Sequence, residues 1–227
     1  MKNILENRCI IFSDIHGHFE ALQKMMEIES SGTFIFCGDI CGYYYQADEC
    51  VQLLRKMGNN LIAVRGNHDQ YYIDSFHDAN ATKYLVNQYG SSYQDKIENV
   101  RDFISDLPLQ ITLELHGKEV HVQHGAPNDY LEGRLYPDTI LPDLEGIYII
   151  GHTHYQMLRT ESRSLWINPG SLGQPRDGKG FSYCTFSTNS MTFSFQSVKV
   201  DITNLISEIR TRDPANKYLE EILYRRS

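Results

Sequence analysis

The sequence predicts an α/β fold, and three regions of the 227-residue chain point to it. In the first third, short runs of β-branched and aromatic residues alternate with amphipathic stretches of helical periodicity. Residues 70–107 carry apolar side chains at helical intervals, and the rest of the chain is rich in strand patterns. Alternation of strand and helix is typical of βαβ units with a largely parallel sheet. Because the sequence shows no repeat, linker or low-complexity stretch, we expect one domain over residues 1–227.

The first third contains three expected strands and two expected helices. Each strand ends in a cluster rich in glycine, aspartate or histidine, and a helix follows each of the first two strands. In the first helix Phe19, Leu22 and Met26 recur at the spacing of one helix face. The expected strands are 8–12, 33–37 and 61–64, and the expected helices are 19–29 and 48–57.

The remaining elements follow from periodicity and turn residues. Two helices are expected in the middle segment, and a proline ends the second. Two hairpins, two buried strands and a closing helix are expected after it. In chain order these features are helices within 70–107 ending at Pro108, a turn at His116-Gly117, strands in 146–154 and 164–170, a turn at Thr188-Asn189, and a helix over 203–224 with a break at Asp213-Pro214.

Composition excludes several classes of function. The net charge of −8, without a block of Lys or Arg, argues against a stable nucleic-acid partner and against anionic membrane surfaces. Because no apolar stretch reaches about 18 residues, we expect no membrane span, and we expect the first residues to be neither a signal nor a transit peptide. The five cysteines form no CxxC pair, and several lie in apolar runs. We therefore expect a reduced, cytoplasmic protein.

Polar side chains that suit a metal follow the apolar runs. In an open α/β sheet, ligands bind beyond the carboxyl ends of the strands, so these side chains are expected to meet. Residues two apart on an extended segment point the same way, which pairs Asp14 with His16 and His152 with His154. Carboxylate, imidazole and amide donors suit Mn, Fe, Zn, Co or Ni. The candidate ligands are Asp14, His16, Asp39, Asn67, His124, His152 and His154.

The number of candidate ligands indicates two ions. Seven donors are too many for one ion and suit a pair, particularly if an aspartate bridges. Taken singly, Asp14 or Asp39 could cap a helix, Asn67 could form a turn, and His124 could be an ordinary loop residue. All five segments follow expected strands, and all carry compatible metal ligands. Chance is therefore a poor explanation for this pattern.

The ordered motifs resemble those of the calcineurin-like metallophosphoesterase superfamily, and specifically its small prokaryotic phosphodiesterases. They are Asp14-Ile15-His16, Gly38-Asp39, Gly66-Asn67-His68-Asp69, His124 and Gly151-His152-Thr153-His154, within residues 8–184. The resemblance implies a four-layer αββα sandwich of two mixed β-sheets flanked by helices. It implies two divalent transition metal ions, with Mn²⁺ expected first and Fe, Zn, Co or Ni as alternatives. One ion would take Asp14, His16, Asp39 and His154, and the other Asp39, Asn67, His124 and His152.

The resemblance also implies the catalytic groups. His68 matches the catalytic histidine of the superfamily. A metal-bridging hydroxide would attack a small, nucleotide-like phosphodiester or phosphomonoester in line. His68 would act as general acid or stabilise the phosphoryl oxygens. Asp69 would either orient His68 or cap a helix. Gly42 and Tyr43 replace the Asp and Arg of the phosphatase motif GD-x-x-DRG, which argues against a protein substrate.

Other residues are candidates for substrate contacts. Arg176, together with Asn67 and His68, is expected to contact the phosphate, whereas Lys179 fits a solvated turn better. The segment 70–107 is a lid over the site or a packing layer. Five tyrosines close to the motifs could stack on a base or simply pack; they are Tyr43, Tyr44, Tyr45, Tyr71 and Tyr72.

Two further hypotheses stay open. The same metal chemistry would serve a dinucleoside polyphosphate hydrolase, or a phosphatase of a protein or a small metabolite. A non-catalytic binding module on this fold is the alternative of another class, although His68 and all seven candidate ligands are present. The oligomeric state does not follow from the sequence.

Overall fold

Two mixed β-sheets form the centre of the computed structural model, which describes residues 5–224. The first sheet has the order β10 (Thr192–Val198), β9 (Phe181–Ser187), β1 (Arg8–Phe12), β2 (Thr33–Phe36), β3 (Leu61–Ala63). The second has the order β4 (Gln110–Leu115), β5 (Lys118–Gln123), β6 (Gly146–Ile149), β8 (Ser164–Pro169), β7 (Gln156–Glu161). The strands β1, β2 and β3 are parallel, as are β5, β6 and β8, so their carboxyl ends lie at one edge of each sheet.

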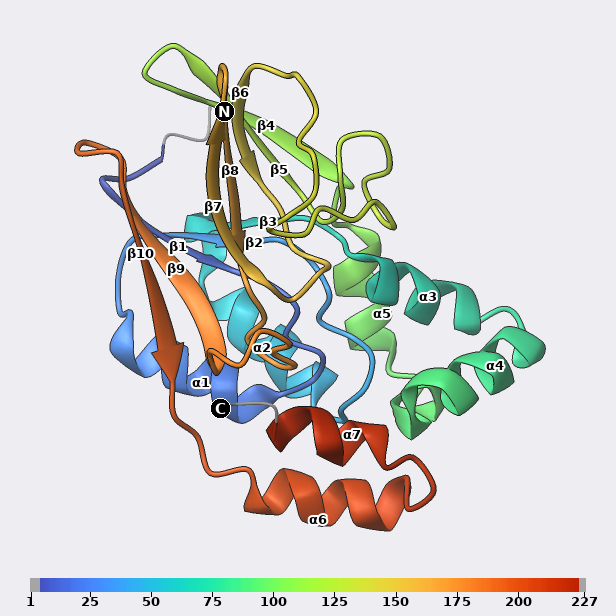
Figure 1. Ribbon diagram of the computed structural model, residues 1–227. Coiled ribbons are helices and arrows are strands. Elements are labelled where there is room, and N and C mark those ends of the chain that lie inside the picture. Colours follow the sequence, from blue (N-terminus) through green and yellow to red (C-terminus); the bar gives the residue numbers. More distant parts are fainter. Residues whose placement is uncertain (1–4, 225–227) are drawn as a thin grey trace.

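The described helices contribute their buried residues to one core on the outer face of the first sheet. In Figure 1 they occupy the lower and right parts of the view, away from the second sheet. The helices are α1 (Phe19–Ile28), α2 (Ala47–Lys56), α3 (Asn67–Ser75), α4 (Ala79–Tyr89), α5 (Glu98–Ser105), α6 (Thr203–Arg212) and α7 (Tyr218–Glu221), with short 3₁₀ turns η1 (Gly58–Asn60), η2 (Ser91–Gln94) and η3 (Ile222–Tyr224).

A second core joins the two sheets face to face. Alternating residues of β1, such as Cys9 and Ile11, meet Val120 and Val122 of β5 there, while Ile10 and Phe12 face the helices. The outer face of the second sheet is covered by the irregular segment 125–145, part of which packs on Trp166. The predicted α/β class with two mixed, helix-flanked sheets is confirmed, and irregular chain covers the outer face of the second sheet.

Most expected elements lie where the sequence placed them. The first hairpin turns at His116-Gly117, where both residues have the positive φ of a type I′ turn (51° and 76°). The closing helix breaks after Arg212, as expected at Asp213-Pro214. The strand β7 was not expected from the sequence, because as an edge strand it exposes half of its residues.

Two other expectations concern cysteines and membranes. All five cysteines are buried and form no disulfide. Within residues 5–224, none of the helices has both the length and the apolar character needed to cross a bilayer.

Candidate metal centre

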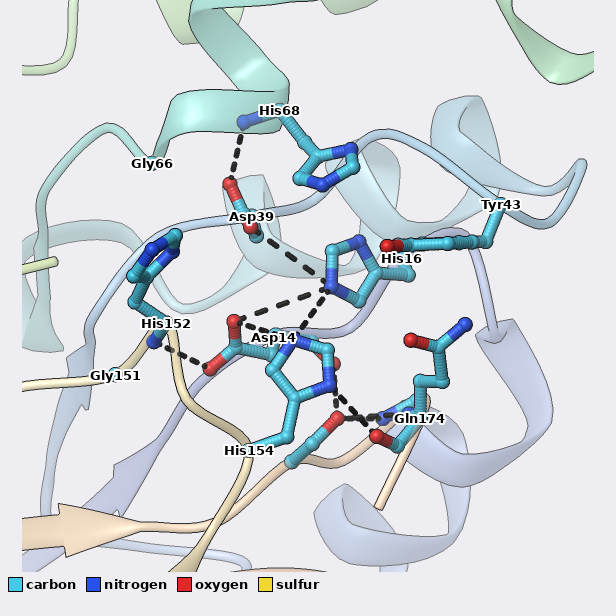
Figure 2. A network of polar contacts seen from close by, with 12 residues as sticks. Asp14, His16, Asp39, Tyr43, Gly66, His68, Gly151, His152, His154 and Gln174 are labelled. Atoms are coloured by element: carbon cyan, nitrogen blue, oxygen red, sulfur yellow. Dashed lines mark hydrogen bonds and ion pairs between the residues drawn. The ribbon is translucent and has the colours of Figure 1, made fainter. Parts of the chain in front are cut away.

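The seven candidate ligands lie just beyond the carboxyl ends of five parallel strands. Asp14 and His16 follow β1, Asp39 follows β2, and Asn67 begins α3 after β3. His124 follows β5, and the two histidines of residues 151–154 follow β6. All seven are buried, with at most 8% of the residue surface exposed. Figure 2 shows Asp14, His16, Asp39 and His154 gathered around a common region.

Ligand atoms from these residues lie close enough to hold cations. The donor atoms of Asp14, His16 and His154 all lie within 4.8 Å of one another. A second group with the same spacing consists of Asp14, Asp39 and His124. Asn67 Oδ1 joins this second group, because it lies 3.0 Å from His124 Nε2 and 3.1 Å from His152 Nδ1.

The ligand loops reach this geometry through left-handed backbone, which differs from the extended segments we expected. Asp14 and His16, and likewise His152 and His154, do point to one region, but a tight turn and not an extended segment brings them together. The left-handed conformation costs an L-residue roughly 1–3 kcal/mol and is concentrated at functional sites. The φ angles are 56° at Asp14, 51° at His16, 67° at Asp39, 68° at His152 and 63° at His154.

Backbone carbonyls determine which ring nitrogen of three histidines faces the site. In each ring Nδ1 donates to a carbonyl oxygen, so Nε2 points at the other candidate ligands and is free of hydrogen when the ring is neutral. The pairs are His16 with Cys41 O (2.8 Å), His124 with Cys37 O (2.7 Å) and His154 with Gln174 O (2.6 Å).

The donor atoms left facing one another fit cations. Nε2 of His16 lies 3.2 Å from Nε2 of His154, although both are acceptors in the neutral tautomers. Two buried carboxylate oxygens, Asp14 Oδ1 and Asp39 Oδ2, receive no backbone or hydroxyl hydrogen bond within the described residues. Converging lone pairs of this kind are stabilised by a metal ion, or by a proton where no ion is bound. The residues present therefore fit the two ions that the motifs imply.

Burial and neighbouring charges shift the pKa values of the four candidate ligand histidines. Burial lowers the pKa of His16 and His154 below the ordinary value, and lowers that of His152 to about 2. These rings are therefore neutral ligands at neutral pH. Burial alone would lower the pKa of His124, but the Asp39 carboxylate 3.3 Å away outweighs it and raises the pKa to about 10. Without a metal, His124 and Asp39 share a proton.

Asp39 lies close to donor atoms of both groups, and Asp14 belongs to both. Asp39 Oδ2 lies 3.8 Å from His16 Nε2 in the first group and 3.3 Å from His124 Nε2 in the second. Its Oδ1 accepts a hydrogen bond from the backbone N–H of His68 at 2.9 Å, which fixes the carboxylate orientation. Gly66 permits this approach, because a Cβ there would lie 2.1 Å from Asp39 Oδ1.

Asp69 holds the loop of Asp39 and makes no hydrogen bond to the His68 ring. Its two oxygens accept from four backbone N–H groups, those of Asp39, Ile40, Cys41 and Gly66, at 2.8–3.0 Å. Both carboxylate oxygens are therefore used by backbone. Through Gly66 N–H, Asp69 caps the start of α3, and the hydrogen bond to the His68 ring involves another residue.

That residue is Tyr93, which belongs to none of the sequence motifs. Its hydroxyl lies 2.6 Å from His68 Nδ1, and both side chains are buried. Tyr93 lies in η2, inside the helical segment 70–107, far along the chain from the metal motifs. No local pattern marks it, because its contact with His68 arises only from the packing of that segment.

The five tyrosines near the motifs divide into two sets. The rings of Tyr43 and Tyr71 lie beside His68, with centroids 4.9 and 5.4 Å from its ring. The hydroxyls of the other three bond elsewhere: Tyr44 to Leu219 O, Tyr45 to Asp213 and Tyr72 to Asp95 O. Tyr43 and Tyr71 remain candidates for substrate contacts, whereas the other three pack the helical layer.

Two arginines flank the ligands. Half-buried Arg176 donates to Tyr43 Oη at 3.3 Å and forms no ion pair among the described residues. Its charge contributes to the lowered pKa of His154. Arg134, which we had not expected at the site, donates from Nε to His152 Nε2 at 3.1 Å. Lys179 is exposed, in agreement with a solvated turn.

The segment after β8 also supports the site. Ser171 Oγ donates to Asp14 O at 2.8 Å, and the N–H of Gly173 donates to the same oxygen at 2.9 Å. Together with the carbonyl of Gln174, these contacts fix the loop of Asp14 and the ring of His154. The sequence signal for this role is the Gly- and Ser-rich run over residues 168–176.

Comparison with known proteins gives consistent results. The sequence model of one family, the calcineurin-like phosphoesterase superfamily domain, matches residues 8–191. An uncharacterized protein of Methanocaldococcus jannaschii is 31% identical, over 91% of this chain and 93% of that protein.

Two crystal structures share the fold. A metallophosphoesterase from Sphaerobacter thermophilus has a TM-score of 0.78 at 23% identity, over 97% of this chain and all of that one. A protein of Pyrococcus horikoshii has a TM-score of 0.77 at 19% identity, over 97% of this chain and 98% of that one. Because the family model matches residues 8–191, the chain belongs to the calcineurin-like phosphoesterase superfamily.

Proposed function

We propose that the protein is a dinuclear metal-dependent phosphoesterase that hydrolyses small phosphodiesters or phosphomonoesters. The observation that carries the proposal is the position of Asp39 Oδ2 between two groups of buried donor atoms. Asp14, His16 and His154 would complete the first ion site, and Asn67, His124 and His152 the second. When bound, two such ions supply a nucleophile from water at neutral pH and offset the charge of the phosphate.

The protein's own residues have three tasks in this reaction. The backbone carbonyls and Asp69 hold the ligands in place before substrate arrives, which lowers the reorganisation needed for catalysis. Asn67 and His68, the first two residues of α3, would contact a substrate oxygen. Arg176, which has no acidic partner within the described residues, supplies a free positive charge for the phosphate.

The surroundings favour a small ester with an aromatic or nucleotide-like group. Tyr43, Tyr71 and Tyr89 gather around His68, and a planar group can stack on such rings. The segment 70–107 supplies Tyr71 and Tyr89, and we propose that it covers the bound substrate. The overall charge of −8 disfavours a long polyanion but leaves room for a compact one at a metal site.

Hydrolysis of model esters tests the proposal. Purified protein loaded with Mn²⁺ is assayed on bis(p-nitrophenyl) phosphate and on p-nitrophenyl phosphate, with metal content measured by elemental analysis. We expect about two ions per chain and turnover of the diester. Asp39→Asn should lose metal and turnover together, whereas Asp74→Asn, an exposed change on α3, should retain both.

The other outcomes separate the alternatives. Turnover of the monoester alone would refute the diesterase preference and support a phosphatase. Cleavage restricted to dinucleoside polyphosphates in an extended panel would support that hydrolase. Two bound ions without turnover of any ester would support a binding module and contradict the proposed enzyme.

A further inference from the structure

The His68 imidazole is held at Nδ1 by a single hydroxyl. Tyr93 Oη lies 2.6 Å from it, and the tyrosine is fully buried. The Tyr93 ring packs against Tyr89 and Tyr72, with centroids 6.1 and 6.4 Å away, which fixes the hydroxyl position. Over residues 5–224 the hydroxyl has no hydrogen-bond partner besides His68 Nδ1.

The hydroxyl is therefore the donor in this hydrogen bond. If Nδ1 carried the hydrogen, the buried O–H of Tyr93 would be left without an acceptor, which costs about 1–3 kcal/mol. Burial raises the pKa of the Tyr93 hydroxyl well above its ordinary value, so the hydroxyl keeps its proton. A neutral imidazole that accepts at Nδ1 carries its own hydrogen on Nε2.

A glycine beside the His68 ring leaves room for the Tyr93 hydroxyl at Nδ1. A Cβ on Gly42 would lie 2.5 Å from His68 Nδ1 and 3.0 Å from Tyr93 Oη. Gly42 also has a φ of 89°, which disfavours other residues. Nδ1 is therefore reached by a hydroxyl from the segment 70–107 and not by a side chain at position 42.

We propose that Tyr93 is a positioning residue that sets the Nε2–H tautomer of His68. The proposal rests on the proposed function, in which His68 lies beside the phosphate ester. His68 then acts as a neutral hydrogen-bond donor through Nε2. The hydrogen stays on Nε2 throughout, because its full transfer would leave an imidazolate, and the leaving oxygen takes its proton from water. Under this proposal His68 stabilises the phosphoryl oxygens and does not act as a general acid.

Tyr93→Phe is the direct test, because it removes the hydroxyl and keeps the ring. Long-range ¹H–¹⁵N spectra of the metal-free protein report the tautomer, with the His68 signals identified by their loss in His68→Ala. We expect wild-type His68 to show the Nε2–H form and Tyr93→Phe to show a mixture. An Nδ1–H form in the wild type, or identical spectra in the two proteins, would overturn the proposal.

Kinetics supply the second readout. With the metal-loaded enzyme we expect Tyr93→Phe to lower kcat about 10-fold while KM stays within about 2-fold. In a His68→Ala background the same change should have no further effect, because Tyr93 acts only through that ring. An additional loss in the double variant would show that Tyr93 acts elsewhere.

A matched control removes a different buried hydroxyl from the same helical layer. Tyr72→Phe deletes a hydroxyl that bonds Asp95 O and Ile97 N and does not touch His68. We expect this variant to keep the wild-type tautomer and kcat; an equal loss of kcat would mark the effect of Tyr93→Phe as structural. If wild type hydrolyses no ester, the proposed function fails, while the spectra still decide the tautomer.

Discussion

At each of three ligand histidines, a backbone carbonyl decides which nitrogen faces the site. Cys37 and Cys41 supply two of these carbonyls from either side of Gly38-Asp39, and Gln174 supplies the third from the segment after β8. A main-chain acceptor is fixed by the fold and has no rotamers, so it orients the ring more firmly than a side chain would. Substitutions at Cys37 or Cys41 that keep the backbone would therefore retain the ligand orientation.

Metal affinity should rise with pH near neutrality. Because the pKa of His124 is raised to about 10, the His124–Asp39 pair holds a proton at pH 7, and a dication must displace it. Lower pH adds protons that compete with the ion, so affinity falls as pH falls. Titration calorimetry at pH 7 in buffers of different ionisation enthalpy should show about one proton released per chain. Binding without proton release, or affinity that falls as pH rises from 6.5 to 8, would contradict this account.

At the scale of elements, short loops at strand ends hold the ligands in a backbone conformation that they would not adopt alone. Five ligands have positive φ, and hydrogen bonds from other loops offset the cost of that conformation. Asp69 at the start of α3 fixes the loop after β2, and the segment after β8 fixes the loop after β1. The site thus depends on contacts between elements that are distant in sequence.

Loss of the Asp69 carboxylate should destabilise the protein. Asp69→Ala leaves four buried N–H groups without an acceptor, and we expect the free energy of unfolding to fall by at least about 3 kcal/mol. Urea denaturation of the metal-free protein measures this change. Asp74→Ala, at an exposed position of the same helix, is the control and should change stability by less than about 0.5 kcal/mol. Equal stability of the two variants would show that Asp69 does not hold the loop.

The elements could be predicted wherever local chemistry determines them. The strands β1, β2 and β3 and both hairpins follow from β-branched runs and turn residues. The edge strand β7 was missed, since its pattern of burial is weak. The convergence of the seven candidate ligands was anticipated from the strand ends, but the left-handed turns that achieve it were not. Tyr93 and Arg134 were missed because packing alone brings them to the site.

At the scale of the whole molecule, the arrangement of the sheets and the net charge together determine which anions can reach the site. The two sheets meet face to face, and parallel strands in each bring ligands to a shared edge. Two dications there would cancel half of the formal charge of −8. A positive site in an acidic protein attracts compact anions while the remaining surface repels extended ones.

Anomalous diffraction from crystals grown with Mn²⁺ tests the central claim most directly. We predict two peaks, one bounded by Asp14, His16 and His154 and the other by Asn67, His124 and His152. Asp39 should lie between the two peaks, with a carboxylate oxygen in contact with both ions. A single peak, two peaks that do not share Asp39, or no peak at these residues in Mn²⁺-saturated crystals would contradict the dinuclear site.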